Sequence, residues 1–287
     1  MRVGFIGAGV MGKTMGLLLG RCGCEVVGYF SRSETSALRV AKEVGGKFYS
    51  DMAKLAANCD VLFLTTPDDA IEQVARTLGE IQCLQPGQIV VHMSGSHTSG
   101  ILMPALGNGA YGLSMHPLQS CASSEEALIN LPISVFSLEG HPEALKVGKA
   151  MVSRIGAQFF VLNSEDKVLY HTAACMASNY FVTLFDAARE LLDISGVDKA
   201  LQVTALNSLV EGTLSNLKIM TPPEALTGPI SRGDIGTVVG HIRSLEEKDP
   251  GLLELYKTLG RRTLKLAREK GKLEEEKLKA LNELFKD

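Results

Sequence analysis

A glycine-rich loop between a short apolar run and a helix constrains this chain more than any other feature of its sequence. Residues 2–6 (Arg-Val-Gly-Phe-Ile) are typical of a buried strand, and residues 10–20 of a helix. The residues that join them, 7–12 (Gly-Ala-Gly-Val-Met-Gly), have the spacing G-x-G-x-x-G. A second apolar run at 25–30 predicts the next strand. Strand, helix and strand in about 30 residues form one βαβ unit.

Each position of this loop has a physical task if the loop binds a dinucleotide. Gly7 permits the tight turn, Gly9 lets the backbone approach a pyrophosphate, and Gly12 lets the helix pack closely on the strand. The start of the helix adds free N–H groups and a partial positive charge. We therefore expect the phosphates of a cofactor on Gly7, Ala8, Gly9, Val10, Met11 and Gly12.

The same loop also fits a second phosphate-binding motif. Extended to Lys13 and Thr14, it satisfies G-x-x-x-x-G-K-[ST], the phosphate loop of nucleotide triphosphatases. A third interpretation is a glycine turn with a purely structural role. The early second strand favours the dinucleotide. So does the apolar run at 61–64, because Thr-Thr-Pro follows it where a triphosphatase would place a magnesium-binding Asp.

The end of the second strand bears on which dinucleotide binds. An NAD site typically has Asp or Glu there, which accepts hydrogen bonds from the ribose hydroxyls. This chain has Ser31, Arg32 and Ser33 instead. Arg32 can pair with a 2′-phosphate and the serines can donate to its oxygens, although an ordinary exposed arginine also fits the pattern. The local chemistry favours NADP(H) over NAD(H).

The alternation of strands and helices continues to about residue 163. Apolar strands of this kind belong in a parallel sheet covered by helices. We predict an α/β fold: a Rossmann domain with a doubly wound, mostly parallel sheet over residues 1–163, and an all-α substrate-binding and dimerisation domain over 164–287. The expected strands continue at 61–65, 88–92, 110–115, 133–137 and 157–161, with helices at 36–45 and 68–80. The expected later helices are 164–195, capped by Ser164, then 198–218, 233–247, 250–270 and 273–286.

Polar residues follow three of the predicted strands. Ligands of doubly wound sheets bind beyond the carboxyl ends of the strands, so these residues can line a cofactor and substrate cleft. Loops are polar in any case, and for His116 alone the two interpretations weigh equally. The cofactor candidates are Thr65, Thr66, Pro67 and Asp68, and the substrate candidates are Ser94, Gly95, His116 and Gln119.

The first helix of the second domain carries a polar stripe. Lys167, His171, Cys175 and Ser178 are spaced by four, four and three residues, so they share one face, and Asn179 lies at its margin. We expect His171, Asn179 and Lys167 to be catalytic. The alternative is that neither has a catalytic role: His171 is then a hydrogen-bonded helix residue and Lys167 a surface charge. Further along, Arg232 can clamp a substrate carboxylate with two parallel bonds.

Composition excludes several classes of protein. The net charge of −3 argues against a nucleic-acid binder, and the apolar runs are shorter than the roughly 20 residues of a membrane span. The six cysteines lack the spacing of metal ligands, so we expect reduced thiols, no metal site and a cytoplasmic protein.

Four segments together resemble a known family. They are 4–12 (Gly-Phe-Ile-Gly-Ala-Gly-Val-Met-Gly), 114–119 (Ser-Met-His-Pro-Leu-Gln), 170–179 (Tyr-His-Thr-Ala-Ala-Cys-Met-Ala-Ser-Asn) and 226–234 (Leu-Thr-Gly-Pro-Ile-Ser-Arg-Gly-Asp). The chain is similar to a family that joins a Rossmann-like domain to a helical C-terminal domain of originally unknown function. That family lies in the 6-phosphogluconate-dehydrogenase-like superfamily, which includes pyrroline-5-carboxylate reductases.

The resemblance implies a function and a set of site residues. It places the cofactor on 7–12, 31–33 and 65–68, and the substrate near Ser94, His116, His171 and Asn179. Relatives often carry a catalytic Lys on the helix after the Rossmann domain, where this chain has His171, so the proton donor is either His171 or Lys167. Some members are implied to be ketopantoate reductases, and a homodimer is expected from the resemblance and from the commonness of such symmetry.

We therefore expect an NADP(H)-dependent oxidoreductase that reduces the carbonyl of a small 2-oxo acid, as ketopantoate reductases do. Three alternatives stay open. The first is an imine reductase of the pyrroline-5-carboxylate reductase type. The second is a phosphotransferase built on Lys13 and Thr14, and the third is a non-catalytic dinucleotide sensor.

Overall fold

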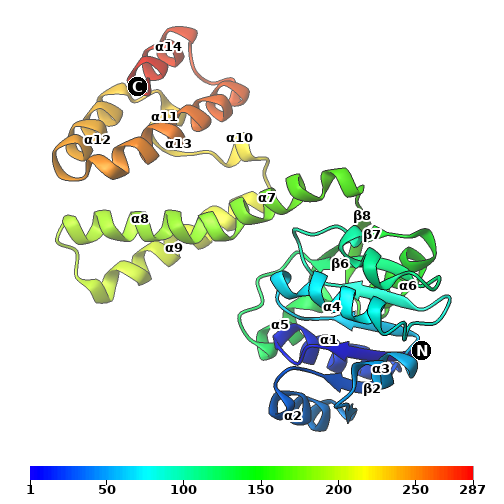
Figure 1. The fold of residues 1–287 in the computed structure, drawn as a ribbon. Helices are drawn as coiled ribbons and strands as arrows, with labels where there is room; N and C mark the ends of the chain where they lie inside the picture. The colour runs from blue at the N-terminus through cyan, green and yellow to red at the C-terminus, as the bar shows by residue number, and fades with distance from the viewer. Residues whose placement is uncertain (287) are drawn as a thin grey trace. The chain divides into compact units, whose positions relative to one another are not determined.

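The computed structural model describes residues 1–286 (Figure 1). Contacts within the chain divide it into two compact units, Met1–Ser178 and Asn179–Asp287. The predicted fold class is confirmed: an α/β unit built on one sheet precedes a helical region. The division between the compact units falls after Ser178, so the first long helix after the sheet belongs with the N-terminal unit.

The N-terminal unit is built on a sheet whose strands follow the order β3-β2-β1-β4-β5-β6-β7-β8. Its first six positions have the arrangement of a dinucleotide-binding fold, in which the strand order reverses beside β1. The strands from β1 to β6 pair in parallel, β7 is antiparallel to β6, and β8 is parallel to β7. Their bounds are β1 Arg2–Ile6, β2 Glu25–Phe30, β3 Lys47–Phe48, β4 Val61–Leu64, β5 Ile89–His92, β6 Tyr111–Pro117, β7 Val135–Gly140 and β8 Gln158–Val161.

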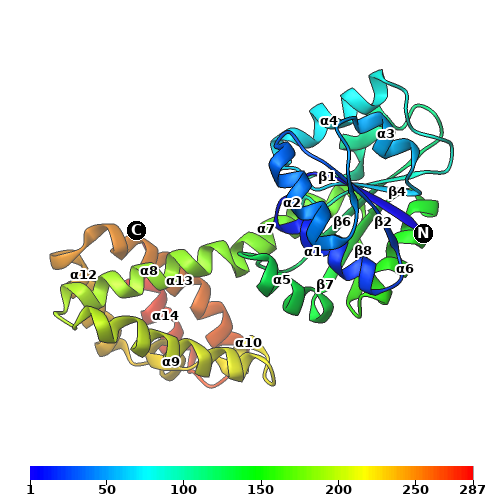
Figure 2. The same ribbon diagram turned by 90° about the horizontal axis from the view of Figure 1, so that it is seen from below.

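Helices cover both faces of this sheet, as Figure 2 shows. One apolar core packs under α1 (Val10–Arg21), α2 (Glu34–Val44), α5 (Ser124–Asn130) and α6 (Pro142–Arg154). The other packs under α3 (Met52–Ala57), α4 (Asp68–Glu80) and the 3₁₀ helix η1 (Ser99–Ala105). The central strands are apolar on both sides because both faces are covered. Within the first core, the ring of Phe5 stacks on Tyr29 and on Phe63, with 5.0 Å between centroids in each pair.

The chain leaves the sheet through a short turn and a helix that stay with the N-terminal unit. After β8 come η3 (Ser164–Asp166) and α7 (Lys167–Ala177). The single helix expected over 164–195 is wrong in two respects. The hydroxyl of Ser164 donates to Glu139 (2.7 Å) instead of capping the helix. The helix is also interrupted at Ser178, after which α8 (Asn179–Ile194) begins the second unit.

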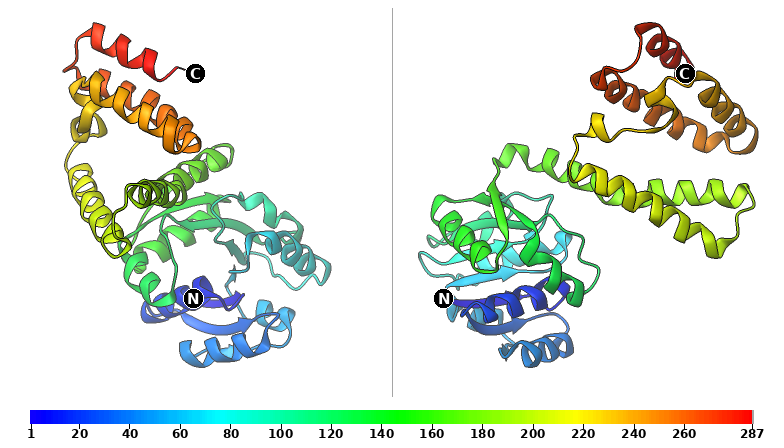
Figure 3. Two further views of the ribbon diagram at one scale, coloured as in Figure 1. Left: turned by 90° about the vertical axis from the view of Figure 1, so that its left-hand side faces the viewer. Right: turned by 180° about the vertical axis from the view of Figure 1, so that it is seen from behind.

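The C-terminal unit is helical throughout its described part, up to residue 286 (Figure 3). The helices α8 and α9 (Lys199–Leu217) contact each other. Gln202 closes their connection, since its amide donates to Asp193 (3.2 Å) and to the carbonyl of Val197 (2.8 Å). The remaining helices are α10 Pro222–Ala225, α11 Gly228–Arg232, α12 Ile235–Lys248, α13 Pro250–Lys270 and α14 Glu275–Leu284. Helices α12 to α14 bury a small apolar core of their own around Val238 and Leu281.

Candidate functional site

The glycine loop has the geometry that close approach of a phosphate requires. Gly7 has a φ of +113°, and a Cβ there would lie 2.5 Å from the carbonyl oxygen of Thr65. A Cβ at Gly12 would lie 2.4 Å from the carbonyl oxygen of Gly7, so α1 packs directly on the loop. A Cβ at Gly9 would meet no atom within 4 Å. The loop is therefore packed tightly at Gly7 and Gly12 and is open at Gly9, where the predicted pyrophosphate approaches.

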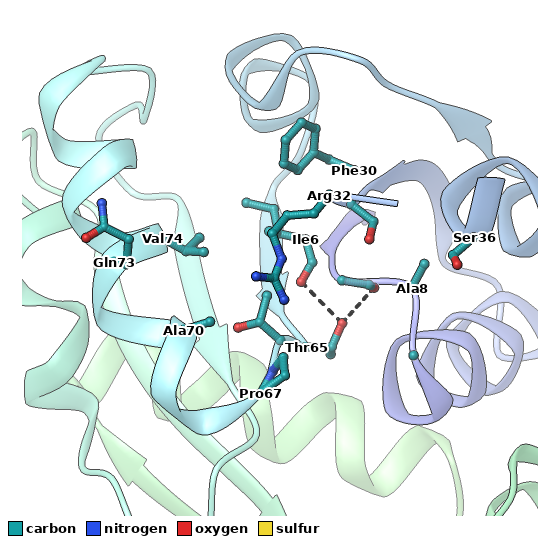
Figure 4. A pocket seen from close by; sticks show the side chains of 14 residues that line it. Ile6, Ala8, Phe30, Arg32, Ser36, Thr65, Pro67, Ala70, Gln73 and Val74 are labelled. Atoms are coloured by element: carbon teal, nitrogen blue, oxygen red, sulfur yellow. Dashed lines mark hydrogen bonds between the residues drawn. The ribbon is translucent and has the colours of Figure 1, made fainter. Parts of the chain in front are cut away.

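The loop opens onto a cavity of about 360 Å³ at the carboxyl ends of β1, β2 and β4 (Figure 4). This is the edge of the sheet where the strand order reverses, the usual ligand position in such folds. Figure 4 shows the guanidinium of Arg32 lying between the glycine loop and α4. Fourteen residues line the cavity, and none of them is acidic: Ile6, Gly7, Ala8, Gly9, Phe30, Ser31, Arg32, Ser36, Thr65, Thr66, Pro67, Ala70, Gln73 and Val74.

The other predicted cofactor residues lie around this cavity without lining it. Val10, Met11 and Gly12 form the first turn of α1. The side chain of Ser33 caps α2 by accepting from the backbone N–H of Ser36 at 3.3 Å. Asp68 begins α4 and accepts hydrogen bonds from the hydroxyls of Ser94 (2.6 Å) and Ser96 (3.1 Å). The sequence did not indicate the helix residues among the lining, because helix periodicity shows which residues share a face but not which face borders a cavity. The lining residues that were not predicted are Ile6, Phe30, Ser36, Ala70, Gln73 and Val74.

The triphosphate-loop interpretation does not fit the side chains that would have to serve it. In such loops the Lys reaches the phosphates and the Ser or Thr hydroxyl binds magnesium. Here Lys13 forms an ion pair with Glu43, at 2.6 Å. Thr14 is fully buried, and its hydroxyl has no hydrogen-bond partner among the described residues. Neither side chain is available at the loop, so this alternative is rejected.

A second cluster of polar residues is built where the start of α7 meets β6 and β7. Lys167 is fully buried, and its Nζ donates to the hydroxyl of Ser114 at 2.8 Å and to that of Ser137 at 3.5 Å. Burial lowers the pKa of Lys167 to about 8, which the charges of Glu139 and Asp68 offset only in part. The interpretation of Lys167 as a surface charge is therefore wrong. A buried lysine with a shifted pKa is typical of a functional site.

Tyr170, one turn further along α7 than Lys167, forms a close pair with His116 of β6. The Tyr170 hydroxyl and His116 Nδ1 are 2.7 Å apart, and the two rings meet edge to face. Burial, followed by the charges of Lys167 and His171, lowers the pKa of His116 to about 4, so its imidazole is neutral at neutral pH. Tyr170 was not predicted as a site residue, although it lies three residues after Lys167 and therefore on the same side of α7.

Gly95 brings His116 and His171 together. A Cβ at Gly95 would lie 2.6 Å from Cδ2 of His171 and 2.7 Å from Nε2 of His116. The centroids of the two imidazoles are 6.2 Å apart. Cys175 approaches His171 from the next turn of α7, with Sγ 3.9 Å from Nδ1. Three predicted residues from separate segments of the chain, Gly95, His116 and His171, are therefore neighbours.

A buried histidine shapes the loop that carries Ser94 and Gly95. The backbone N–H of Ser94 donates to His92 Nδ1 at 3.2 Å, and His92 Nε2 lies 3.1 Å from the carbonyl oxygen of Thr98. Burial lowers the pKa of His92 to about 4. A neutral imidazole has one donor and one acceptor, and this arrangement uses both. His92 therefore holds the loop closed on itself.

The remaining predicted site residues lie elsewhere. Gln119 is exposed, and its side chain accepts from the backbone N–H of the next residue, Ser120, at 2.9 Å. Asn179 is the first residue of α8, and Arg232 is the last residue of α11. Both belong to the C-terminal unit.

Two other kinds of feature are absent from residues 1–286. No group of three or more His, Cys, Asp and Glu side chains there is placed to hold a metal ion. In the same part of the chain, no helix combines the length and the apolar character needed to cross a membrane.

Comparison with known proteins agrees with this architecture. A model of Rossmann-like domains matches residues 1–117, and a model of a domain of unknown function (DUF2520) matches residues 134–263. No curated protein matches the sequence.

Solved structures share the fold over almost the whole chain. A Thermotoga maritima protein is 29% identical with a TM-score of 0.75, over 94% of this chain and 100% of its own. A Bacteroides fragilis protein, provisionally described as an NADP oxidoreductase, is 23% identical with a TM-score of 0.71, over 94% of this chain and 97% of its own. A pyrroline-5-carboxylate reductase of Streptococcus pyogenes is 18% identical with a TM-score of 0.64, over 95% of this chain and 99% of its own.

Proposed function

We propose that the chain is an NADP(H)-dependent oxidoreductase that reduces the carbonyl of a small 2-oxo acid, in the manner of ketopantoate reductases. The observation that carries this proposal is the glycine loop, open at Gly9, beside a cavity that contains Arg32 and is lined by no acid. A site of this kind fits the pyrophosphate and the 2′-phosphate of NADP(H). The structural likeness to an NADP oxidoreductase supports the fold that such a site needs.

The residues that would hold the cofactor follow from the cavity. The backbone N–H groups at the start of α1 would receive the pyrophosphate. Arg32 has no ion pair or hydrogen bond within the described chain, so its guanidinium is free to bind a 2′-phosphate. The hydroxyls of Ser31 and Ser36, which also line the cavity, would add hydrogen bonds. When bound, the cofactor would supply a hydride to the carbonyl carbon.

The histidine cluster would supply the proton and stabilise charge on the oxygen. His171 is partly exposed beside Gly95, and as an imidazolium it would donate a proton to the developing alkoxide. Lys167 is fully buried, so we assign it an electrostatic role rather than direct contact with substrate. The roles predicted for Asn179, a hydrogen bond to the same oxygen, and for Arg232, binding of the carboxylate, belong to this proposal.

Binding and turnover test the proposal separately. Thermal-shift titrations with NADPH, NADH and ATP should show the largest stabilisation with NADPH. Loss of NADPH absorbance should then follow addition of small 2-oxo acids, ketopantoate among them. Turnover of cyclic imines alone would instead identify an imine reductase. NADPH binding without turnover of either substrate class would identify a dinucleotide sensor, and stabilisation by ATP alone would overturn the proposal.

His171→Ala tests the assigned proton donor. We expect kcat to fall by about 10²–10⁴-fold, the range for loss of a general acid, with NADPH affinity nearly unchanged. Thr172→Ala is the matched control, because Thr172 is the next residue of α7, is exposed, and donates its hydroxyl to the carbonyl of Val168 and not to His171. Equal turnover of His171→Ala and the wild type would remove His171 from the mechanism.

A further inference from the structure

The pair formed by Tyr170 and His116 is part of a longer hydrogen-bonded chain that begins inside the sheet. Lys167 Nζ donates to the hydroxyl of Ser137 at 3.5 Å, in addition to that of Ser114. Ser137 also hydrogen-bonds the hydroxyl of Tyr170, and that hydroxyl lies 2.7 Å from His116 Nδ1. Lys167 and Ser137 are both fully buried. The chain of contacts therefore runs Lys167, Ser137, Tyr170, His116, without solvent at its origin.

The chemistry of Lys167 determines which group donates in each of these hydrogen bonds. An ammonium group has three donors and no acceptor, so the Ser137 oxygen accepts from Lys167. The hydroxyl hydrogen of Ser137 is then available for the Tyr170 oxygen, and the hydroxyl hydrogen of Tyr170 for His116 Nδ1. Burial is the main reason that the pKa of Tyr170 is raised, so this phenol keeps its proton. His116 Nδ1 is then an acceptor, and a neutral imidazole must carry its one hydrogen on Nε2.

The position of that Nε2 atom indicates what the hydrogen-bonded series of side chains does. Nε2 of His116 and Cδ2 of His171 border the same point above Gly95, where a Cβ would lie within 2.7 Å of both atoms. We propose that Lys167, Ser137 and Tyr170 fix His116 in the Nε2–H tautomer, and that this N–H donates a hydrogen bond to the reacting oxygen or nitrogen of the substrate. His116 is then a catalytic residue and Tyr170 a positioning residue. The inference rests on the proposed reductase function and adds a donor to it.

A neutral donor at this position has a physical advantage. It stabilises negative charge that develops on the substrate oxygen without first having to be protonated, and it needs no reorganisation during the reaction. The proton itself comes from His171. The two histidines therefore have different tasks, and the difference arises from their partners. His116 Nδ1 is joined to the hydroxyl of Tyr170, whereas the nearest partner of His171 Nδ1 is Sγ of Cys175, at 3.9 Å.

Nitrogen-15 NMR of the imidazoles tests the tautomer without any substrate. In the wild type we expect His116 to show a protonated Nε2 and an unprotonated Nδ1 at neutral pH. Tyr170→Phe keeps the ring but removes the hydroxyl, so the His116 signals should move toward a mixture of tautomers. His92 is the internal control, because its partners Ser94 and Thr98 are untouched by the substitution. A His116 that carries its hydrogen on Nδ1 in the wild type would overturn the inference.

Kinetics test the donor role. His116→Ala should lower kcat/KM by about 10²–10³-fold, the usual effect of removing one such donor. His116→Gln retains an N–H group and should recover part of that loss, and Tyr170→Phe should lower kcat more than it raises KM. Tyr170→Phe with wild-type kcat and an unchanged tautomer would refute the inference while the reductase function stands. No turnover by the wild type with any oxo acid or imine would refute the function, and the NMR result would remain valid.

Discussion

Gly95 is the residue on which the geometry of the histidine cluster depends most directly. Because a methyl group there would lie 2.6 Å from His171 and 2.7 Å from His116, Gly95→Ala must displace at least one imidazole. A misplacement of about 1 Å at a reacting centre can lower a rate by about 10²-fold. We expect a fall in kcat of that order for Gly95→Ala, with NADPH affinity unchanged, measured by steady-state kinetics and fluorescence titration.

Gly107→Ala is the control for this substitution. A Cβ at Gly107 would meet no atom within 4 Å, and Gly107 does not need a left-handed backbone. Its variant should therefore retain wild-type turnover. Wild-type turnover by Gly95→Ala as well would show that the two imidazoles are not positioned for chemistry.

Arg32 decides the cofactor preference in our proposal. A hydrogen bond to a charged group contributes about 1.5–3 kcal/mol, so Arg32→Ala should weaken NADPH binding by about 10–100-fold. NADH binding should change little, because NADH has no 2′-phosphate. Isothermal titration with both cofactors measures the difference.

Arg39→Ala is the matched control for Arg32, since Arg39 is an exposed arginine that lies on α2 and pairs with Glu43. It should leave both affinities unchanged. Equal weakening of NADPH and NADH by Arg32→Ala would argue against recognition of a 2′-phosphate.

The sequence indicated most of the residues that the structure brings together, but not the contacts among them. Gly95, His116 and His171 were expected at a site from strand ends and helix spacing, and they are neighbours. The pairing of Tyr170 with His116 was not foreseen, because it joins residues 54 positions apart in the sequence. The burial of Lys167 was not foreseen either, because charge alone gives no sign of whether a helix face is covered.

At the scale of elements, α7 places a buried cation against the sheet, and this affects stability. The folded chain lowers the pKa of Lys167 from 10.5 to about 8. Between these values the unfolded chain still holds a proton that the folded chain has released. The contribution of Lys167 to the free energy of unfolding therefore rises with pH across this window, and it is least favourable below about pH 8. The shift corresponds to about 3 kcal/mol in the free energy of unfolding.

Lys167→Met isolates this contribution. Urea denaturation of the wild type and the variant should give a difference in unfolding free energy that changes by about 2–3 kcal/mol between pH 8 and 10.5, in the direction that favours the wild type at high pH. Other groups that titrate in this range cancel in the difference. A constant difference across the window would show that Lys167 is not desolvated in the folded protein.

Hydrophobic patterning predicted the main elements well and the direction of strands poorly. The strands at 2–6 and 25–30 and the helix at 68–80 were found at the expected positions. Short elements such as β3 and α3 lack enough residues for a pattern. The antiparallel pairing of β7 with β6 was not visible, because the period of a strand is the same in both directions. The break at Ser178 was also missed, since Ser178 is compatible with a helix interior.

At the scale of the whole molecule, α8 and α9 leave apolar surface without a covering layer in the described chain. No residue of α8 is buried, and Gln202 is the buried residue of α9. Leu201 and Leu209 are 61% and 69% exposed. Exposed apolar helices of this extent mark an interface. We propose that a second copy covers them in a homodimer, which is the commonest closed symmetry among oligomers.

Sedimentation tests the proposed dimer. The wild type should sediment as a dimer, and Leu201→Glu/Leu209→Glu should sediment as a folded monomer at the same concentration, because each leucine loses about 1.5–3 kcal/mol of burial. Ile133→Glu is the control, since Ile133 is 79% exposed in the N-terminal unit and should leave the dimer intact. A monomeric wild type would refute the proposal.

The ion pair between Lys13 and Glu43 and the buried hydroxyl of Thr14 also bear on how sequences are sorted into enzyme classes. A text search for the ATP-binding signature would retrieve this chain and file it among kinases and ATPases. In this chain the lysine already has a carboxylate neighbour and the next residue faces the protein interior, and both features argue against such an assignment. Both features can be read from coordinates alone, before any assay is chosen.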